Sequence, residues 1–114
     1  MPEEETIKFD EWQKLDLRVG KILSVEPHPN ADKLYLLEVD LGPLGKRKLV
    51  AGLKQHYDSK KLIGKLCVVF TNLEHATIRG IKSEGMILAA VNEGKSKVFI
   101  IKPEKEIELG SKIH

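Results

Sequence analysis

The side chains of this sequence with the clearest chemical potential are basic ones gathered in its middle. Residues 1–16 hold two bases and six acids, and residues 103–114 hold two bases and three acids. Subtracting both ends from totals of 19 bases and 17 acids leaves 15 bases and 8 acids in between. This surplus fits a polyanionic partner. Six bases fall on predicted turns or polar strand faces, where they can neutralise phosphates: Lys33, Lys46, Lys48, Lys54, Arg79 and Lys82.

Signatures of catalysis and metal binding do not occur in the sequence. It has no Gly-x-Ser-x-Gly elbow and no Gly-x-x-x-x-Gly-Lys-Ser/Thr loop, and Ser83 beside Glu84 is the nearest approach to a nucleophile. The four histidines are scattered, which favours turn or surface positions over a zinc site. The single Cys67 lies in an apolar run and is expected to be a buried, inert thiol. We therefore expect no enzyme activity, no cofactor and no metal.

Aromatic residues are few, at 5% of the chain. Trp12 can stack on a base, but its three-residue spacing from Phe9 favours packing against the core. Tyr35 and Tyr57 leave the same two alternatives open, and Tyr57 is the better candidate for exposure. Proteins that bind single strands need more stacking platforms than this, so the composition favours recognition of a folded RNA by charge and shape.

The elements that must position these residues are mostly short strands. Phe9, Trp12 and Leu15 predict one or two helical turns that plug one end of a core, and Gly20 predicts a bulge or bend in a long first strand. Strands over residues 35–41 and 46–51 alternate apolar and polar positions.

A small helix is predicted next, with Asp58 or Ser59 at its N-terminus and Gly64 at its end. Strands over 65–70, 86–91 and 97–101 complete the chain, with a loop between the first two. This order predicts an all-β fold with small helices, specifically a five-stranded OB-fold barrel with a C-terminal extension.

The last three predicted strands are apolar on both faces: Leu66–Phe70, Met86–Val91 and Val98–Ile101. A strand with one wet face should alternate, so a second surface must cover them. We expect a homodimer formed through the C-terminal half.

Length and composition indicate one domain over residues 9–112, preceded by an acidic tail over residues 1–8. No apolar stretch approaches the roughly 18 residues that span a bilayer, and the acidic start is unlike a secretory signal. We expect a cytoplasmic protein with no membrane partner.

Four segments carry a resemblance to a known family: Asp16–Ile22, His28–Tyr35, Val50–Leu53 and Gly80–Ala89. The chain resembles the tRNA-binding domain found in free-standing tRNA-binding proteins, in methionyl-tRNA synthetases as a C-terminal domain or detached beta subunit, and in endothelial monocyte-activating polypeptide. The resemblance covers about residues 9–112. It implies an OB barrel, homodimers joined through the C-terminal extension, and tRNA binding with little sequence preference.

The same resemblance implicates particular residues in RNA binding: Asn30, Lys33, Asn72, Ser83, Glu84 and Met86. From the sequence alone, Ser83 and Glu84 also suit a turn, and Met86 also suits the core. The implied role is that of an accessory subunit or trans-acting partner of a methionyl-tRNA synthetase, whose catalytic chain is then a second partner.

One relative within the family offers an alternative, because it is a secretion chaperone that binds unfolded polypeptides. That relative lacks the complete Ser-Glu-Gly-Met sequence, which is present here at residues 83–86 and favours tRNA. A synthetase catalytic role is the weakest interpretation, since the chain is short and has no His-Ile-Gly-His or Lys-Met-Ser-Lys-Ser signature.

Overall fold

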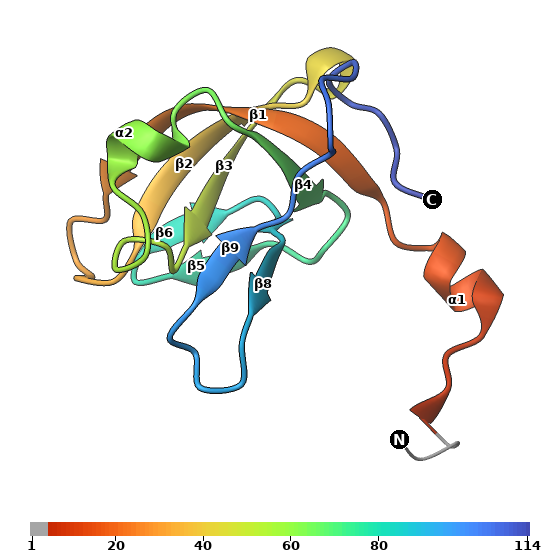
Figure 1. The fold of residues 1–114 in the computed structure, drawn as a ribbon, viewed down its shortest axis with the longest axis horizontal. Coiled ribbons are helices and arrows are strands. Elements are labelled where there is room, and N and C mark those ends of the chain that lie inside the picture. The colour runs from red at the N-terminus through yellow and green to blue at the C-terminus, as the bar shows by residue number, and fades with distance from the viewer. Residues whose placement is uncertain (1–4) are drawn as a thin grey trace.

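A long first strand, β1, organises the computed structural model, which describes residues 5–114 (Figure 1). Residues 1–4 of the predicted acidic tail lie outside the described residues. The elements in chain order are α1 (Phe9–Gln13), β1 (Leu17–Pro27), β2 (Tyr35–Asp40), the 3-10 helix η2 (Gly42–Leu44), β3 (Lys46–Ala51), α2 (Ser59–Leu62), β4 (Leu66–Phe70), β5 (Ala76–Ile78), β6 (Ile81–Ser83), β7 (Met86–Ile87), β8 (Ala89–Val91) and β9 (Val98–Ile100).

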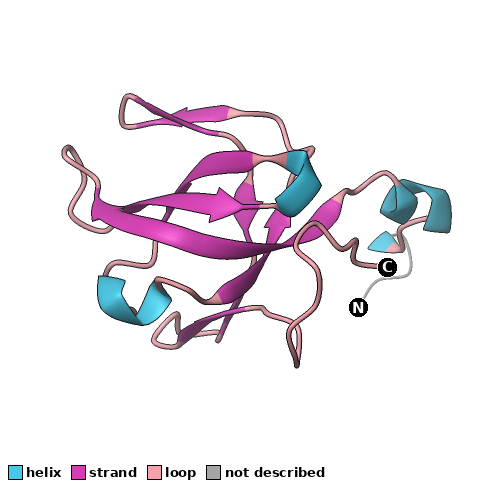
Figure 2. Cartoon of the chain, turned by 90° about the horizontal axis from the view of Figure 1, so that it is seen from above, coloured by secondary structure: helices cyan, strands magenta, loops and turns pink. Residues whose placement is uncertain are grey.

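Five strands form one antiparallel sheet in the order β3-β2-β1-β4-β7. The first half of β1, Leu17–Lys21, pairs with β4, and its second half, Lys21–Pro27, pairs with β2. Because one strand serves two neighbours in succession, the sheet curls into a nearly closed barrel (Figure 2). The predicted all-β fold with small helices and a five-stranded OB-like barrel is confirmed.

Gly20 lies where β1 changes partner, and the barrel wall approaches it closely. A Cβ atom at this position would lie 2.5 Å from Val39 Cγ1 and 2.9 Å from Leu41 Cδ2. The bulge that the sequence placed at Gly20 occurs at Leu23, where the β1–β2 register shifts between Ile22 and Ser24. Gly20 therefore supplies room for the opposite strand, and Leu23 supplies the irregularity.

The core fills the barrel with the inward residues of the alternating strands. Leu37, Val39 and Leu49 are buried as their spacing predicted. The helix α2 closes one end, because its Leu62 is fully buried in the same cluster. Asp58 caps α2 by accepting a hydrogen bond from the amide of Lys60, as predicted.

The predicted plug over residues 9–15 is wrong. The helix α1 has no buried residue, and it stands outside the barrel in both views (Figures 1 and 2). Phe9 is 71% exposed and Trp12 37% exposed, so the packing of Trp12 against the core is also wrong. The three-residue spacing identified an apolar helix face correctly, but it could not show what that face meets.

The segment between β4 and β7 is a β-hairpin where the sequence predicted only a loop. Strands β5 and β6 pair through Ile78 and Ile81, around a two-residue turn of Arg79 and Gly80. Both turn residues have positive φ, at 53° and 89°, as type I′ hairpin turns require. Three-residue strands are too short to show a sequence period, so the hairpin escaped prediction.

The last strands are divided differently from their prediction. The stretch 86–91 splits at Leu88, since β7 pairs with β4 and β8 pairs with β9. Ile100 is buried and Val98 half-buried, whereas Phe99 between them is exposed. Phe99 is therefore the exposed apolar residue of this strand. Charged substitutions at Val98 or Ile100 would disturb the core, so they cannot serve to test a dimer interface.

The C-terminal segment runs along the half of β1 that β2 leaves free. The amide of Gly110 donates to the carbonyl of Val19, the amide of Val19 donates to Ser111, and the amide of Ile113 donates to Leu17. These bonds bring the end of the chain beside α1 (Figure 1). Both extensions therefore lie at one end of the barrel.

Replacing Gly20 by alanine is expected to lower the free energy of unfolding by about 1–3 kcal/mol, because the new methyl group overpacks against Val39. Urea unfolding followed by circular dichroism measures this change. Gly94→Ala is the matched control, since nothing lies within 4 Å of a Cβ atom there. Equal stability of the two variants would contradict the close approach at Gly20.

Candidate nucleic-acid interface

His28 joins the two loops that carry several of the candidate residues. Its Nδ1 accepts a hydrogen bond of 2.9 Å from the amide of Asn30, so its Nε2 carries the proton and donates to the carbonyl of Ile78 at 3.0 Å. His28 lies at the predicted turn, but its 4% exposure shows that it is buried there and not on the surface. His28 thus fixes the turn after β1 against the β5–β6 hairpin.

The predicted phosphate ligands are distributed over this turn, β3 and the hairpin. Lys48 and Lys82 come together, because both line a cavity of about 230 Å³ between the outer face of β1–β3 and β6. The remaining bases do not line it. Lys54 is half-buried after β3, and the others are exposed: Lys33 in the turn, Lys46 on β3 and Arg79 at the hairpin tip.

Ser83 and Glu84 close the barrel. The amide of Val50 in β3 donates to Ser83 Oγ at 3.0 Å, and Ser83 Oγ donates to the carbonyl of Gly85 at 2.9 Å. The amide of Lys48 donates to Glu84 Oε1 at 2.9 Å, and the amide of Glu84 donates back to the carbonyl of Lys48. These two side chains join the free edge of β3 to the segment that enters β7.

Gly85 makes this seam possible. Its φ is +148°, and a Cβ atom there would lie 2.8 Å from the carbonyl oxygen of Phe70. Ser83 is buried, whereas Met86 is 52% exposed, which excludes the core position that the sequence left open for it. Met86 lies instead beside an apolar groove that Val91 and Val98 also line.

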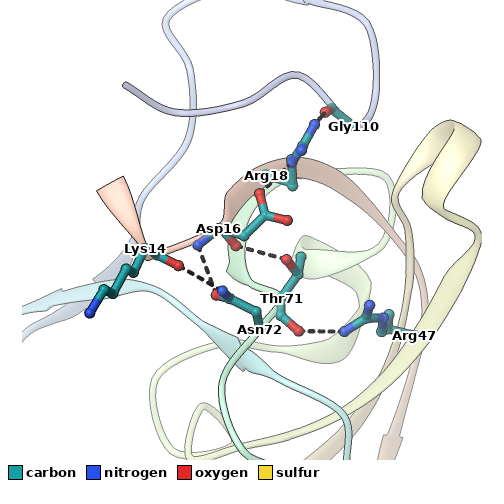
Figure 3. A network of polar contacts seen from close by, with 7 residues as sticks. All are labelled: Lys14, Asp16, Arg18, Arg47, Thr71, Asn72 and Gly110. Carbon is teal, nitrogen blue, oxygen red and sulfur yellow. Dashed lines mark hydrogen bonds and ion pairs between the residues drawn. The ribbon is translucent and has the colours of Figure 1, made fainter. Parts of the chain in front are cut away.

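Asn72 uses its side-chain amide within the fold. Its Oδ1 accepts a hydrogen bond of 2.8 Å from the amide of Asp16, and its Nδ2 donates to the carbonyl of Lys14 at 2.7 Å (Figure 3). The residue is exposed on its outer side. Asn72 therefore anchors the link between α1 and β1, whereas the side chain of Asn30 has no recorded hydrogen bond within residues 5–114.

Arg47 is a residue that the site prediction missed. Its Nη1 donates to the carbonyls of Thr71 at 2.6 Å and Glu84 at 3.1 Å (Figure 3 shows the first). One guanidinium therefore holds both ends of the segment that contains the hairpin. The available signal was its position in register with the inward Leu49 and Ala51, where a charged residue needs partners.

A second arginine ties the C-terminal segment to the barrel. Arg18 pairs with Asp16 at 2.6 Å and donates to the carbonyl of Gly110 at 2.9 Å (Figure 3). Burial alone would raise the pKa of Asp16, but the hydrogen bond and charge of Arg18 outweigh it and hold that pKa below its ordinary value. The carboxylate is thus kept ionised beside its partner.

Cys67 is fully buried, and its thiol donates to the carbonyl of Gly20 at 3.6 Å. Burial raises the pKa of this thiol to about 12, with a smaller opposing effect from that hydrogen bond. The predicted buried, inert thiol is confirmed. Within residues 5–114 no three His, Cys, Asp or Glu side chains are grouped as metal ligands.

The fold defines an OB-like barrel with a cavity on the outer face of its sheet, lined by two lysines and two glutamates. Residues 17–112 match the family described as "Putative tRNA binding domain". Since this match covers most of the chain, the protein belongs to that family.

Relatives and solved structures agree with this assignment. The chain is 50% identical over 111 residues to methionine–tRNA ligase of Pyrococcus horikoshii, covering 97% of this chain and 15% of the ligase. A MetRS-related protein from P. horikoshii superposes with a TM-score of 0.89 at 29% identity, over 96% of this chain and 99% of the other. Chaperone CsaA from Bacillus anthracis superposes with a TM-score of 0.86 at 31% identity, over 96% and 99%.

The described part of the chain, residues 5–114, contains no helix with the length and apolar character needed to cross a membrane.

Replacing Ser83 by alanine is expected to lower the free energy of unfolding by about 1–3 kcal/mol, because the amide of Val50 loses its partner in a buried seam. Chemical denaturation measures the loss. Ser96→Ala, at an exposed hairpin turn, is the control and should cost less. A Ser83→Ala protein of unchanged stability would show that the seam does not depend on this hydroxyl.

Proposed function

We propose that this protein binds tRNA by charge and shape and has no catalytic activity of its own. It acts in the cytoplasm as the accessory subunit or trans-acting partner of a methionyl-tRNA synthetase. The single observation that carries the proposal is the meeting of Lys48 and Lys82 at one cavity, beside loops that His28 holds together. Two lysines are thus held on a preorganised surface of a barrel of the tRNA-binding family.

The structure supports a division of labour among the proposed RNA-binding residues. Ser83, Glu84 and Asn72 use their side chains within the fold, so they act by positioning the loops. The exposed bases Lys33, Lys46, Lys48, Arg79 and Lys82 contact phosphates, with Lys54 at the margin of this surface. Asn30 and Met86 are exposed and free to contact bases or sugars.

The relation to methionine–tRNA ligases supports the proposed partner. This chain spans about 15% of the length of the P. horikoshii ligase that it matches, so it corresponds to one part of that protein. A single domain over residues 9–112 is proposed to supply tRNA affinity, while a separate catalytic chain performs aminoacylation.

A second function is favoured by the likeness to chaperone CsaA together with the apolar groove beside Met86. Val91 and Val98 line this groove, and an unfolded polypeptide could place apolar side chains in it. We favour tRNA because the complete Ser-Glu-Gly-Met sequence is present and the basic loops are exposed.

We also propose a homodimer that joins through α1 together with the C-terminal extension, by which we mean the residues that follow β9. Ile7 and Phe9 are 69% and 71% exposed on a segment too short to be a stable helix in isolation. Trp12 and Ile113 line a common hollow there, so both extensions contribute to the surface. Pairing two such ends removes the exposed apolar residues from water.

Lys48→Ala and Lys82→Ala are each expected to weaken binding of all tRNAs alike and to reduce the slope of log affinity against log salt by about 1, because one phosphate contact is lost. Fluorescence anisotropy with three tRNAs over a salt series measures this. Lys97→Ala, at an exposed lysine before β9, is the matched control and should keep the wild-type slope.

Competition against labelled tRNA distinguishes the tRNA-binding function from the chaperone function. It also distinguishes recognition by charge alone from recognition of the folded shape. Folded tRNA should compete better than heat-unfolded tRNA, duplex DNA or an unfolded polypeptide. Stronger competition by the polypeptide would favour the chaperone function, and equal affinity for tRNA and duplex DNA at every salt concentration would contradict shape recognition.

Light scattering at micromolar concentration should return the mass of a dimer, whose interface buries at least roughly 1,200 Å². Phe9→Glu is expected to give a monomer, because the charge lies in the proposed interface. Phe99→Glu, at a phenylalanine of β9 that is also well exposed, should leave the dimer intact. The reverse result would place the interface on β8–β9, and a monomeric wild-type protein would contradict the dimer.

A further inference from the structure

The cavity between β1–β3 and β6 has a lining that phosphate binding does not explain. Its volume of about 230 Å³ lies below the roughly 300 Å³ at which pockets for drug-sized ligands begin, so it suits a group smaller than a drug-sized ligand. Two carboxylates, of Glu26 and Glu38, line it together with Lys48 and Lys82. Carboxylates repel phosphate. The lysines can therefore bind the phosphates of a nucleic acid at the mouth of the cavity, while a different chemical group enters it.

Three polar side chains cross the outer face of the sheet in a row. Glu38 on β2 lies directly opposite Ser24 on β1 and directly opposite Lys48 on β3. Opposed residues of antiparallel strands share a face, with Cβ atoms about 4.5–5.5 Å apart. All three line the cavity. The row therefore presents a hydrogen-bond acceptor in the centre with a donor on each side.

The acceptor at the centre of the row is unengaged. Across residues 5–114 the structure records one ion pair, between Arg18 and Asp16, and no hydrogen bond to the carboxylate of Glu38. Glu38 is half-buried rather than fully solvated. Both of its oxygens can therefore accept hydrogen bonds from a ligand.

Apolar side chains from two elements line the same cavity. Leu36 lines the cavity from β2, and Ile81 lines it from the β5–β6 hairpin that His28 holds in place. A heterocycle in this cavity would contact these apolar side chains as well as the polar row, as unpaired bases of folded RNA do when a protein holds them.

We infer that this cavity holds one unstacked guanine of the bound RNA, an inference that rests on the proposed function. The N1–H and N2–H groups of guanine donate in parallel to the two oxygens of Glu38, and its O6 accepts from the hydroxyl of Ser24. Adenine presents an acceptor at N1 and uracil presents two carbonyls, which a carboxylate repels. Lys82, which lines the cavity from β6, binds an adjoining phosphate.

Mononucleotides of equal charge test the site without the rest of the RNA. Titration of ¹⁵N-labelled protein with 5′-GMP is expected to shift the amide resonances of Glu38, Lys48, Ile81 and Lys82. 5′-IMP, which differs only by loss of the N2 amino group, should bind about tenfold more weakly, the effect of one lost hydrogen bond to a charged group. 5′-AMP should not produce saturable shifts there.

Glu38→Gln should abolish the preference for GMP over IMP, because the amide offers one acceptor in place of two. Glu93→Gln, an exposed glutamate at the β8–β9 turn, is the matched control and should keep it. Equal binding of the three nucleotides, or GMP shifts confined to other residues, would overturn the guanine site. Failure of the wild-type protein to bind tRNA would overturn the proposed function instead. The GMP titration tests the cavity separately from tRNA binding.

Discussion

The closure of the barrel at the free edge of β3 is the constraint on which the rest of the structure depends. The strand β7 has only two residues and pairs with β4, so it cannot close the sheet by itself. Ser83 and Glu84 complete the closure by satisfying the amides of Val50 and Lys48. An edge left open would expose backbone donors and acceptors to another chain. The same residues therefore protect the fold and set where the hairpin leaves it.

Two further side chains turn this closed barrel into a positioned surface. Arg47 binds the carbonyls at both ends of the segment that contains β5 and β6, and His28 binds the carbonyl of Ile78 at its middle. A hairpin of two three-residue strands is too short to be stable alone. Fixed at three points, it holds Lys82 and Ile81 over the outer face of the sheet. Preorganisation of this kind lowers the entropy that a ligand must overcome.

The sequence predicts the parts of this molecule that depend on local periodicity or local capping. Alternation places Leu37, Val39 and Leu49 inside, and α2 starts at one of the two caps that the sequence offered, Asp58. Contacts between distant segments leave no such trace. Nothing near Asn72 in the sequence shows that it bonds to Asp16, 56 residues away. The spacing of Phe9 and Trp12 predicts an apolar helix face, but it does not predict what that face packs against. The sequence therefore identified the segments that carry the candidate site. The hydrogen bonds that individual side chains make could be assigned only from the folded structure.

The placement of the two ends of the chain has a consequence for how the barrel can be joined to other molecules. Both α1 and the C-terminal segment lie at one end of the barrel, and the turn after β1 lies at the other (Figures 1 and 2). A molecule attached at either terminus therefore leaves the turn after β1 and the β5–β6 hairpin accessible. Two copies joined at that end would carry their loops at opposite poles of an elongated particle. Such a particle is bivalent, and its apparent affinity for an RNA would depend on whether one molecule can reach both poles.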